Sequence, residues 1–406
     1  MDKELVPELR FEGFEEPWRQ YALDKICKSL DTGKSVNSED RAPSKGEISI
    51  LKTSCVSEDY FNPKERKRVV PSEVSLVKCP ATAGSIIVSR MNTPEKVGAC
   101  GYVADNYPNL FLPDRLWRLT LEAGYDPYLL YTSLVSPSYR TVVKGMASGT
   151  SGSMHNVPQE AFLKMTLDTP DTKEEQAQIG DLFRDLDSLI AEQERKCAAL
   201  GTARDALLDK MFPKEGETEP ELRFDGFSGP WERVKLGELL SYEQPQAYIV
   251  SNSEYNDSHG IPVLTAGKTF ILGYTVECFG VKQATKMKPV ILFDDFTTAC
   301  KYVDFPFKVK SSAAKILIPT TKCDCTYLVY ESMNMINYEP LSHGRHWISM
   351  FSSFSINLPV SPFERQMLNF MLINIDENIN GENQKLDLLK QLKGAMLDKM
   401  FPKGAR

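Results

Sequence analysis

The side chains of this 406-residue chain that could do chemistry are hydroxyl, amide and basic groups gathered in two polar stretches. The first, YRTVVKGMASGTSGSMHNV at 139–157, is interpreted as a loop and contains Arg140, Lys144 and His155 but no acidic residue. The second, HGRHW at 343–347, places an arginine between two histidines. Hydroxyl groups, arginine and lysine suit contacts with phosphates and with the edges of bases. These stretches therefore predict binding to a nucleic acid rather than a reaction.

Motifs that would mark an enzyme are missing from the sequence. An adenine methyltransferase needs an N/D-P-P-Y/F element for the flipped base, and the nearest string, DNYP at 105–108, has the wrong order. No G-x-x-x-x-G-K-[ST] phosphate loop is present. Neither Pro113–Asp114 nor Pro170–Asp171 is followed by the acid-x-Lys step of a metal-dependent nuclease. The sequence therefore favours a non-catalytic chain.

A metal site is not indicated either. His343 and His346 have a spacing that metal ligands can adopt, but no acidic or cysteine partner lies close in sequence. We interpret this pair as part of a loop or as a DNA contact. The nine cysteines are scattered, and the C-D-C spacing of Cys323 and Cys325 is not the C-x₂-C of a zinc site. Buried reduced thiols are the favoured interpretation of the cysteines.

Composition and charge limit the class of protein further. The chain is 42% apolar and 25% charged, which is ordinary for a globular protein of two to four domains. Its net charge of −7 argues against an indiscriminate polyanion binder, so any nucleic-acid contact must come from local patches or from partners. No apolar run approaches the roughly 18 residues of a membrane span, and the N-terminus has no signal-peptide pattern. We expect a cytoplasmic protein without a membrane partner.

Two phrases occur twice and reveal an internal repeat. PELRFEGFEEPW at 7–18 returns as PELRFDGFSGPW at 220–231, and ALLDKMFPK at 206–214 returns as AMLDKMFPK at 395–403. The first phrase has apolar residues every few positions and a glycine, Gly13 or Gly226, that permits a tight turn. We interpret each copy as a strap that fixes a globular domain to the end of a helix, or as a surface offered to a partner.

The second phrase closes a long segment with helical periodicity in each half. Apolar residues recur at steps of three and four, and the two segments align without gaps from Glu175/Glu364 to Lys214/Lys403. Each predicts a helix of about 40 residues, roughly 60 Å long. Such a narrow apolar face needs a partner, so we expect the two helices to pair as an antiparallel intramolecular coiled coil. The alternative is two helices that lie on separate cores.

The blocks between these elements predict mixed α/β domains. Strand-like runs include SIIVSRM at 85–91, LWRLTLE at 116–122, PVILFDDF at 289–296, AAKILIP at 313–319 and SFSINLP at 353–359. The first run and the residues that follow it (85–103) align, with a short gap, with the third run and its continuation (289–303). Both read as strand, polar turn, strand. The turn itself differs, with Arg90–Met91–Asn92 in one block and Asp294–Asp295 in the other. A shared scaffold with different turns suggests two readers of different targets.

The candidate DNA-binding residues follow from these turns and polar stretches. Six lysines against three aspartates between Lys286 and Lys315 add a local basic surplus to the second block. In the first block the candidates are Arg90, Asn92, Lys96, Arg140, Lys144, Ser148, Thr150, Ser151, Ser153 and His155. In the second block they are Lys268, Thr297, Thr298, Lys301, Lys310, Arg345 and His346.

Taken together, these features resemble the specificity (S) subunit of type I restriction–modification systems over essentially the whole chain. The resemblance is carried by PELRFxGFxxxW, by the helix start at Glu175–Gln176, and by FLPDRLWRL (111–119), ASGTSGSMHNVPQEAF (147–162) and FDDFTTACKYVDFPFKVKSSAAKIL (293–317). The second helix start reads Pro362–Phe–Glu–Arg–Gln and lacks the Glu-Gln pair, so its contact there is expected to differ.

The resemblance implies two target-recognition domains that each read half of a split, asymmetric DNA sequence. It also implies docking of two methyltransferase (M) subunits, which hold S-adenosylmethionine, and of endonuclease (R) subunits, which use ATP and Mg. The expected parts are a strap and first recognition domain (1–170), a central spacer helix (171–214), a second strap and recognition domain (215–360), and a C-terminal spacer helix (361–406). The halves would form a cyclic repeat with an approximate twofold axis.

Two other functions are compatible with the residues themselves. One is a stand-alone DNA-modifying enzyme with an unfamiliar site, and the other is a coiled-coil adaptor whose globular domains bind proteins. If the helices act as a spacer, their length is expected to set the number of unread base pairs between the half-sites, because a helix of this length is commensurate with one turn of B-DNA, about 34 Å.

Overall fold

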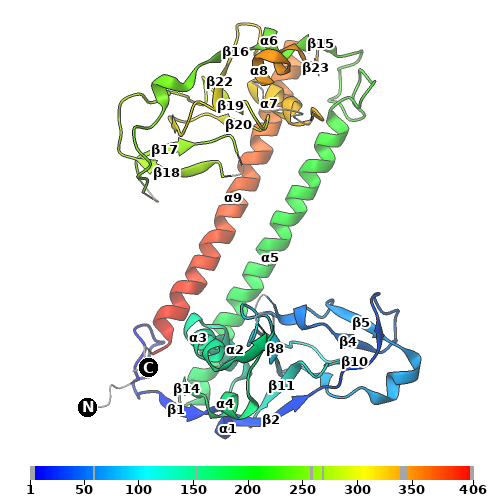
Figure 1. Ribbon diagram of the computed structural model, residues 1–406, viewed down its shortest axis with the longest axis vertical. Coiled ribbons are helices and arrows are strands. Elements are labelled where there is room, and N and C mark those ends of the chain that lie inside the picture. Colours follow the sequence, from blue (N-terminus) through cyan, green and yellow to red (C-terminus); the bar gives the residue numbers. More distant parts are fainter. Residues whose placement is uncertain are drawn as a thin grey trace. The chain divides into compact units, whose positions relative to one another are not determined.

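The computed structural model describes residues 5–57, 60–151, 154–256, 259–267, 269–338 and 346–402 of the chain (Figure 1). The chain forms two compact units. Unit 1 comprises Met1–Glu194 together with Lys385–Arg406, and unit 2 comprises Arg195–Gln384. Both units mix helices with strands, which confirms the predicted α/β class. Among the described residues, no helix combines the length and apolar character that crossing a bilayer requires.

Unit 1 is built on a four-stranded antiparallel sheet in the order β2 (Cys27–Thr32), β11 (Leu116–Leu121), β7 (Ile86–Ser89), β9 (Cys100–Tyr102). A second sheet has the order β3 (Ser38–Glu39), β5 (Arg66–Val69), β4 (Ser49–Leu51), β10 (Tyr107–Phe111), β6 (Pro80–Ala81). Smaller sheets are β12 (Ser148–Ser151), β13 (Met154–Asn156), β8 (Met91–Asn92), and β1 (Arg19–Ala22) with β14 (Thr166–Thr169). The helices are α1 (Leu23–Ile26), α2 (Pro127–Val135), α3 (Pro137–Met146) and α4 (Gln159–Lys164), with 3₁₀ turns at Thr53–Val56 and Pro71–Leu76.

Unit 2 has a sheet of the same design. Its four-stranded antiparallel sheet has the order β16 (Leu240–Glu243), β22 (Ala314–Pro319), β19 (Val290–Asp294), β20 (Cys300–Val303). The smaller sheets are β18 (Ile271–Thr275), β17 (Ile261–Leu264), β21 (Lys308–Val309), and β15 (Glu232–Lys235) with β23 (Ser355–Leu358). The helices are α6 (Leu236–Leu239), α7 (Thr326–Asn334) and α8 (His346–Ser349), with 3₁₀ turns at Pro245–Tyr248 and Phe351–Ser353.

The strands predicted from the sequence are confirmed. Each of the five strand-like runs contains a strand, namely β7, β11, β19, β22 and β23. The predicted strand–turn–strand correspondence also holds, because β7 pairs with β9 and β19 pairs with β20, both antiparallel. Consecutive side chains of both β7 and β19 are buried. In β7, Ile86 and Val88 belong to one hydrophobic core and Ile87 to another, so this strand is covered on both faces.

One prediction about local structure was wrong. The stretch 139–157 was interpreted as a loop, but it contains most of α3 and then the strands β12 and β13. The helix is amphipathic, and its apolar Tyr139 and Val143 are buried in the core of unit 1. The glycine and serine content of the hairpin concealed the two strands, because such composition is also typical of loops.

The two long helices are confirmed: α5 (Lys173–Met211) and α9 (Pro362–Met400) each contain 39 residues. In unit 1 the first half of α5 lies against the last part of α9, where Lys393 Nζ is 2.5 Å from Asp187 Oδ1. In unit 2 the last part of α5 lies against the first half of α9, where Lys196 Nζ is 2.7 Å from Glu382 Oε1. Within each unit the helices therefore run in opposite directions.

The strap of unit 1 is held by a buried carboxylate at the start of α5. Both oxygens of Glu175, which is 1% exposed, accept hydrogen bonds from Arg10, at 2.7 Å from Nε and 2.9 Å from Nη2. Trp18 Nε1 donates a third bond to the same carboxylate at 3.1 Å. Such a two-pronged arginine–carboxylate pair fixes both distance and orientation. We call this arrangement the clasp; it explains why arginine stands in the repeated phrase.

Unit 2 repeats the clasp with one contact fewer. Arg223 donates to both oxygens of the fully buried Glu364, at 2.7 Å from Nε and 2.9 Å from Nη2. The indole nitrogen of Trp231, which corresponds to Trp18, has no hydrogen-bond partner among the described residues. The predicted tight turns are confirmed, since Gly13 has φ +92° and Gly226 has φ +89°. The Arg–Glu pair is thus the common element of the two straps.

The closing phrase of each helix meets a strap. The backbone N–H of Leu9 donates to the carbonyl of Lys399 at 2.9 Å, and that of Leu222 donates to Lys210 at 2.8 Å. Phe401 packs edge-on against Trp18, and Phe212 packs in the same way against Trp231. The first strap therefore contacts the end of α9, whereas the second contacts the end of α5. Both repeated phrases are accounted for by this internal packing.

The helix starts have different side chains at the position that lost the Glu-Gln pair, but the expected difference in contact is not found at the preceding proline carbonyl. In unit 1 the Gln176 amide donates to the carbonyl of Pro170 at 2.8 Å. In unit 2 Arg365 takes this place and donates from Nε to the carbonyl of Pro359 at 2.6 Å. It also lies 3.6 Å from Asp324 and 2.8 Å from Glu232. The contact is kept although the residue changes.

The two units also differ in the residue that caps the N-terminus of the equivalent helices α2 and α7. Asp126 caps α2 by accepting from the backbone N–H of Tyr128 and Leu129. Gly180 of α5 leaves room for it, since a Cβ there would lie 2.3 Å from Asp126 Oδ1. In unit 2 the cap position is Cys325, and Asn369 of α9 instead accepts from the first backbone N–H groups of α7.

This difference between the caps predicts that one substitution destabilises unit 2 and that a second substitution restores its stability. Asn369→Gly should destabilise unit 2 by about 1–2 kcal/mol, because α7 loses its cap and α9 gains a flexible residue. Asn369→Gly with Cys325→Asp should recover most of that loss, because it restores the arrangement of unit 1. Urea denaturation monitored by circular dichroism measures both. Equal stabilities for the single and double variants would show that the cap is not what Asn369 contributes.

Candidate nucleic-acid interface

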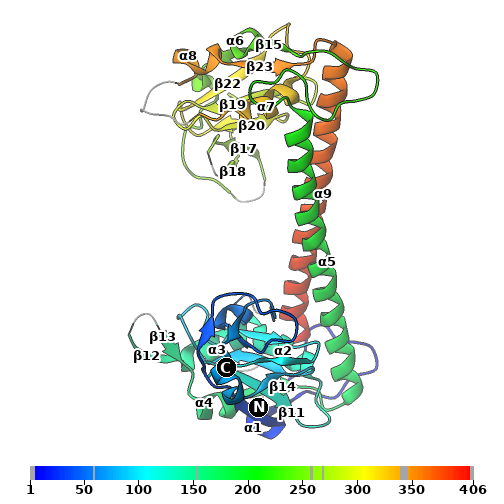
Figure 2. The ribbon, with the colours of Figure 1, turned by 90° about the vertical axis from the view of Figure 1, so that its right-hand side faces the viewer.

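The predicted residues of the first block meet on the three-stranded sheet β12–β13–β8 of unit 1. The register pairs Ser148 with Asn156 and His155 with Asn92, so the three strands bring residues far apart in sequence side by side. Figure 2 shows the hairpin of β12 and β13 at the edge of unit 1. Ser148 is exposed, and His155 is half-buried. An exposed sheet edge with hydroxyl and imidazole groups suits contacts with phosphates and bases.

Arg90 and Asn92 are held in place by their neighbours. The Arg90 guanidinium lies 5.5 Å from the ring centre of the buried Trp117, and its Nε donates to Asn156 Oδ1 at 3.3 Å. Asn92 is only 9% exposed and bonds through its amide to Ser89 and to the backbone of Thr93. The Trp117 ring therefore orients Arg90. The buried Asn92 side chain instead stabilises the turn after β7 through its hydrogen bonds.

Basic groups surround the same turn. Lys96 and Lys144 are exposed, and Arg140 Nη1 donates to the carbonyl of Val97 at 3.2 Å. The pKa of the Glu95 carboxyl lies below its usual range because its own backbone N–H and Thr93 donate to it, and because Lys144 and His155 add positive charge. The strands and α3 therefore gather these side chains into one partly basic surface.

In unit 2 the predicted threonines lie on the turn between β19 and β20, which is equivalent to the turn after β7. Asp294 Oδ1 accepts from the backbone N–H of both Phe296 and Thr297 at 2.9 Å, which closes the turn. Thr298 adopts φ +60°, a conformation that is costly for a branched residue. The turn exposes Thr297 and the ring of Phe296, which is 44% exposed.

The basic surplus of the second block is partly internal. Lys308 is 1% exposed and forms an ion pair of 2.9 Å with Glu277, and Lys315 is 2% exposed and donates to Gln244 Oε1 at 2.9 Å. These two lysines therefore cannot serve as a basic surface. Lys310 is exposed after β21, and Lys301 is half-buried on β20. The four-stranded sheet therefore contributes one predicted lysine, Lys301. The sheet that contains β17 and β21 contributes the other, Lys310.

The remaining predicted residues have different placements. His346 is 4% exposed, with its ring against Tyr338 and its Nδ1 3.1 Å from the Tyr338 hydroxyl. Its burial gives no support to the predicted contact with DNA, and it contributes to the core. Ser153, Lys268 and Arg345 lie outside the described residues, as do the side chains of Thr150 and Ser151.

Sequence reasoning missed a framework that fixes each domain to the long helices. The Tyr128 hydroxyl donates to Asp187 at 2.8 Å, and Asp187 pairs with Lys393. In unit 2 the Tyr327 hydroxyl donates to Asp376, which pairs with Arg204. Burial raises the pKa of both tyrosines, so they act as neutral donors. The strings YLLY (128–131) and YLVY (327–330) were the available signal.

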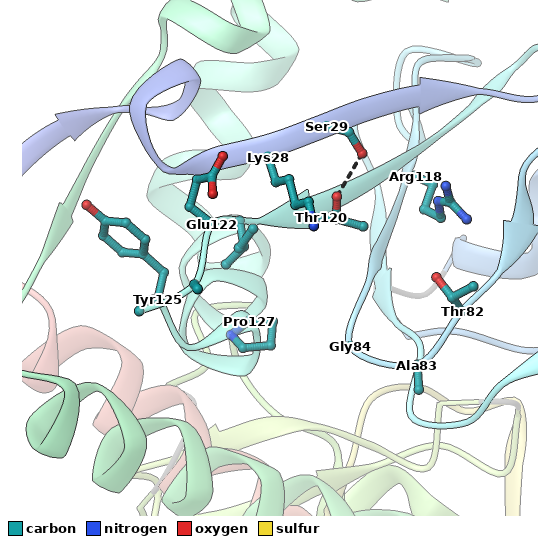
Figure 3. A pocket seen from close by; sticks show the side chains of 13 residues that line it. Lys28, Ser29, Thr82, Ala83, Gly84, Arg118, Thr120, Glu122, Tyr125 and Pro127 are labelled. Carbon is teal, nitrogen blue, oxygen red and sulfur yellow. Dashed lines mark hydrogen bonds between the residues drawn. The ribbon is translucent and has the colours of Figure 1, made fainter.

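A cavity of about 450 Å³ in unit 1 lies beside the start of β2 and the end of β11 (Figure 3). Arg118 lines it but is engaged by Asp31 at 2.7 Å and by the carbonyl of Pro80. Ser29 and Thr120 hydrogen-bond each other at 2.7 Å. Several of its polar groups are therefore already engaged in hydrogen bonds. Nothing in this lining pairs a nucleophile with a base, as a hydrolytic or transfer site would require.

Two comparisons with known sequences match part of the chain. Residues 15–200 match the family model described as type I restriction modification DNA specificity domain. A segment of 145 residues is 48% identical to the type I restriction enzyme EcoR124I/EcoR124II specificity subunit of Escherichia coli. That match covers 34% of this chain and 34% of the relative, so only about a third of either protein is related at this level.

The fold is shared over nearly the whole chain. The crystal structure of a type I restriction–modification system S subunit from M. genitalium superposes with a TM-score of 0.73. It covers 98% of this chain and 100% of that chain, with 15% sequence identity. At such low identity the likeness concerns the fold alone, and it includes both units and both long helices.

Proposed function

We propose, on the premise that residues 15–200 belong to the family of type I restriction modification DNA specificity domains, that this chain is the DNA-sequence-specificity subunit of a type I restriction–modification complex. Unit 1 and unit 2 each contain one target-recognition domain, and each reads one half of a bipartite, asymmetric DNA site. The chain itself is non-catalytic. Methylation and cleavage belong to partner subunits that dock on it.

The observation that carries this proposal is the pairing of one scaffold with two different surfaces. The four-stranded sheets of the units have the same topology, and the turn after the third strand is exposed in both. In unit 1 this turn presents Arg90 and Lys96; in unit 2 it presents Thr297 and an exposed phenylalanine. Equivalent positions with different side chains are what two readers of different sequences need.

The long helices act in this proposal as an antiparallel coiled coil that links the two readers. Ion pairs between α5 and α9 within unit 1 and within unit 2 support such pairing. A linked pair of readers makes the second DNA contact intramolecular, which raises its effective concentration. The halves then form a cyclic repeat, since each strap meets the end of the helix from the other copy.

The partners follow from the same proposal. Two methyltransferase subunits dock on the chain and supply S-adenosylmethionine, and endonuclease subunits supply the ATP- and Mg-dependent steps. The chain's own contribution is to bind the DNA and to orient it toward the partner that modifies it. A basic partner would also offset the net charge of −7 that disfavours DNA binding by this chain alone.

The test is to map methylated adenines in the genome of a host that carries this chain and its methyltransferase. A split, asymmetric motif is expected, and inserting a few residues into both long helices should lengthen its unread gap. A motif without a gap, or a gap unchanged by the insertion, would contradict the proposal. Methylation by the purified chain alone would favour a stand-alone enzyme, and no DNA retention with the methyltransferase present would favour a protein-binding adaptor.

The exposed lysines of unit 1 give a further prediction. Replacing both Lys96 and Lys144 by alanine should weaken DNA binding of the assembled complex at all sequences to a similar extent. If both contact phosphates, the slope of log affinity against log salt concentration should fall by about 2, roughly 1 per lysine. Fluorescence anisotropy over a salt series measures it, with Lys164→Ala as the control because Lys164 is paired with Glu160 on α4. An unchanged slope would remove the two lysines from the interface.

A further inference from the structure

An exposed apolar stripe lies at the start of α9 in unit 2. Its members are Val360, Phe363, Met367 and Phe370; Val360 is 59%, Phe363 66% and Phe370 69% exposed, whereas Met367 is half-buried. The helical members follow one another at steps of four and three residues, so they share one face of α9. Phe227 of the second strap extends this face, with its ring centre 6.3 Å from that of Phe363. We call Val360, Phe363, Met367 and Phe370 the Phe363 stripe.

The equivalent face of unit 1 is acidic. The helices align through Glu175 and Glu364, which form the two clasps, and through Asp187 and Asp376, which bind the two tyrosines. This alignment sets the four stripe residues opposite Asp171, Glu174, Gln178 and Asp181, all of them exposed. At the same four positions, three carboxylates and an amide in unit 1 therefore replace four apolar side chains in unit 2.

The comparison shows that the fold does not need the apolar residues. Unit 1 builds the same helix start, the same strap and the same clasp with charged residues at these positions. Two phenylalanines that are two-thirds exposed are unfavourable in water and promote unwanted association. Such residues are explained when another molecule covers them.

The size of the stripe indicates what kind of molecule covers it. A phenylalanine side chain can bury roughly 200 Å², so the exposed parts of the stripe offer on the order of 400 Å². A stable interface needs about 800 Å² from each partner. Two copies of this chain joined only through the stripe would fall well short of that area. The stripe instead suits the apolar centre of a larger contact with a protein that also binds the surrounding surface.

We propose that the Phe363 stripe is a docking surface, present in unit 2 only, for an apolar patch on the methyltransferase subunit. This inference rests on the proposed function, which supplies two copies of that partner. Because the strap and the helix start are alike in both units, they offer contacts common to the two positions. The stripe adds apolar burial at one of them. The two methyltransferase positions are therefore unequal, and the one on unit 2 binds more tightly.

The test gives unit 2 the residues of unit 1. The variant Phe363→Glu, Met367→Gln, Phe370→Asp carries the side chains that α5 tolerates at the equivalent positions, so it should fold, and its circular dichroism melt checks this. Native mass spectrometry and calorimetry with the purified methyltransferase subunit of the same system measure the number and affinity of bound copies. The wild-type chain should bind two copies unequally, and the variant should bind its tighter copy on the order of 30-fold more weakly.

A matched control is Glu174→Gln with Asp181→Asn in unit 1, which should leave the tighter position unchanged. Two equal positions in the wild-type chain, or a variant that binds as the wild type does, would overturn the proposal while leaving the specificity function intact. A wild-type dimer that the variant converts to a monomer would overturn it in favour of a second copy of this chain. No binding of the methyltransferase to the wild-type chain would contradict the proposed function itself.

Discussion

Replacing Arg223 by alanine is expected to lower the free energy of unfolding of unit 2 by about 3–5 kcal/mol. Glu364 is fully buried, and both of its carboxylate oxygens accept hydrogen bonds from Arg223. Without the arginine, the carboxylate would remain buried without a counter-charge. This is costly, because a buried ion that loses its partner keeps its desolvation penalty. Urea denaturation followed by tryptophan fluorescence measures the loss.

The two clasps provide an internal control for this prediction. In unit 1 the corresponding Arg10→Ala change leaves Glu175 with the hydrogen bond from the Trp18 indole. The loss there should be smaller by about 1 kcal/mol, the typical value of one retained bond. Adding Glu364→Met to Arg223→Ala should recover much of the stability, since it removes the stranded charge. Equal losses in the two units, or no recovery in the double variant, would show that the carboxylate is not the cause.

The fold was largely predictable because duplication made the signal visible. The phrase around Arg10 and Arg223 and the periodicity of the long helices predicted two similar halves and two helices of about 40 residues, and the structure has two units and two 39-residue helices. What the sequence did not reveal is the partner of the repeated arginine. Glu175 and Glu364 lie 165 and 141 residues further along the chain, and no local pattern links residues so far apart.

The candidate site was predictable only in part, because side-chain type does not determine exposure. Asn92 and His155 pair across β8 and β13, as two separate polar stretches would have to do to form one surface. Lys308 and Lys315, by contrast, contribute to a basic count in the sequence but are buried beside Glu277 and Gln244. Whether a lysine is internal depends on a carboxylate or amide from a distant part of the chain, which composition alone cannot reveal.

Arg204→Ala is the second change for which a large effect is expected, a loss of about 3–5 kcal/mol in unit 2 near neutral pH. Arg204 donates to Asp376 Oδ2 at 2.8 Å and to Glu331 Oε1 at 2.7 Å, and Glu331 is only 3% exposed. Its removal leaves two neighbouring carboxylates without their shared cation. In unit 1 Thr132 stands where unit 2 has Glu331, so the Asp187–Lys393 pair, which is about as exposed as Arg204–Asp376, has no second buried carboxylate beside it. Lys393→Ala should therefore cost about 1 kcal/mol or less.

The pH dependence of this loss has a definite sign. Burial raises the pKa of the Glu331 carboxyl above its usual value even with Arg204 present, and Arg204 opposes that shift. Without Arg204 the folded-state pKa should rise further. The folded state then binds a proton that the unfolded state does not, so stability increases as the pH falls. The destabilisation caused by Arg204→Ala should thus shrink as the pH is lowered from about 7 to about 5, because the raised carboxyl takes up its proton more readily at lower pH.

Denaturation of the wild type and the variant at several pH values between these limits measures the effect. The variant with Glu331→Gln added serves as the control, because it lacks the carboxyl whose titration is invoked and should show a flatter profile. A loss that is constant with pH, or that grows on acidification, would mean that Arg204 acts through packing of its aliphatic stem rather than by neutralising Glu331. The comparison with Lys393→Ala then shows whether the additional carboxylate of Glu331 makes the stability of unit 2 depend on Arg204.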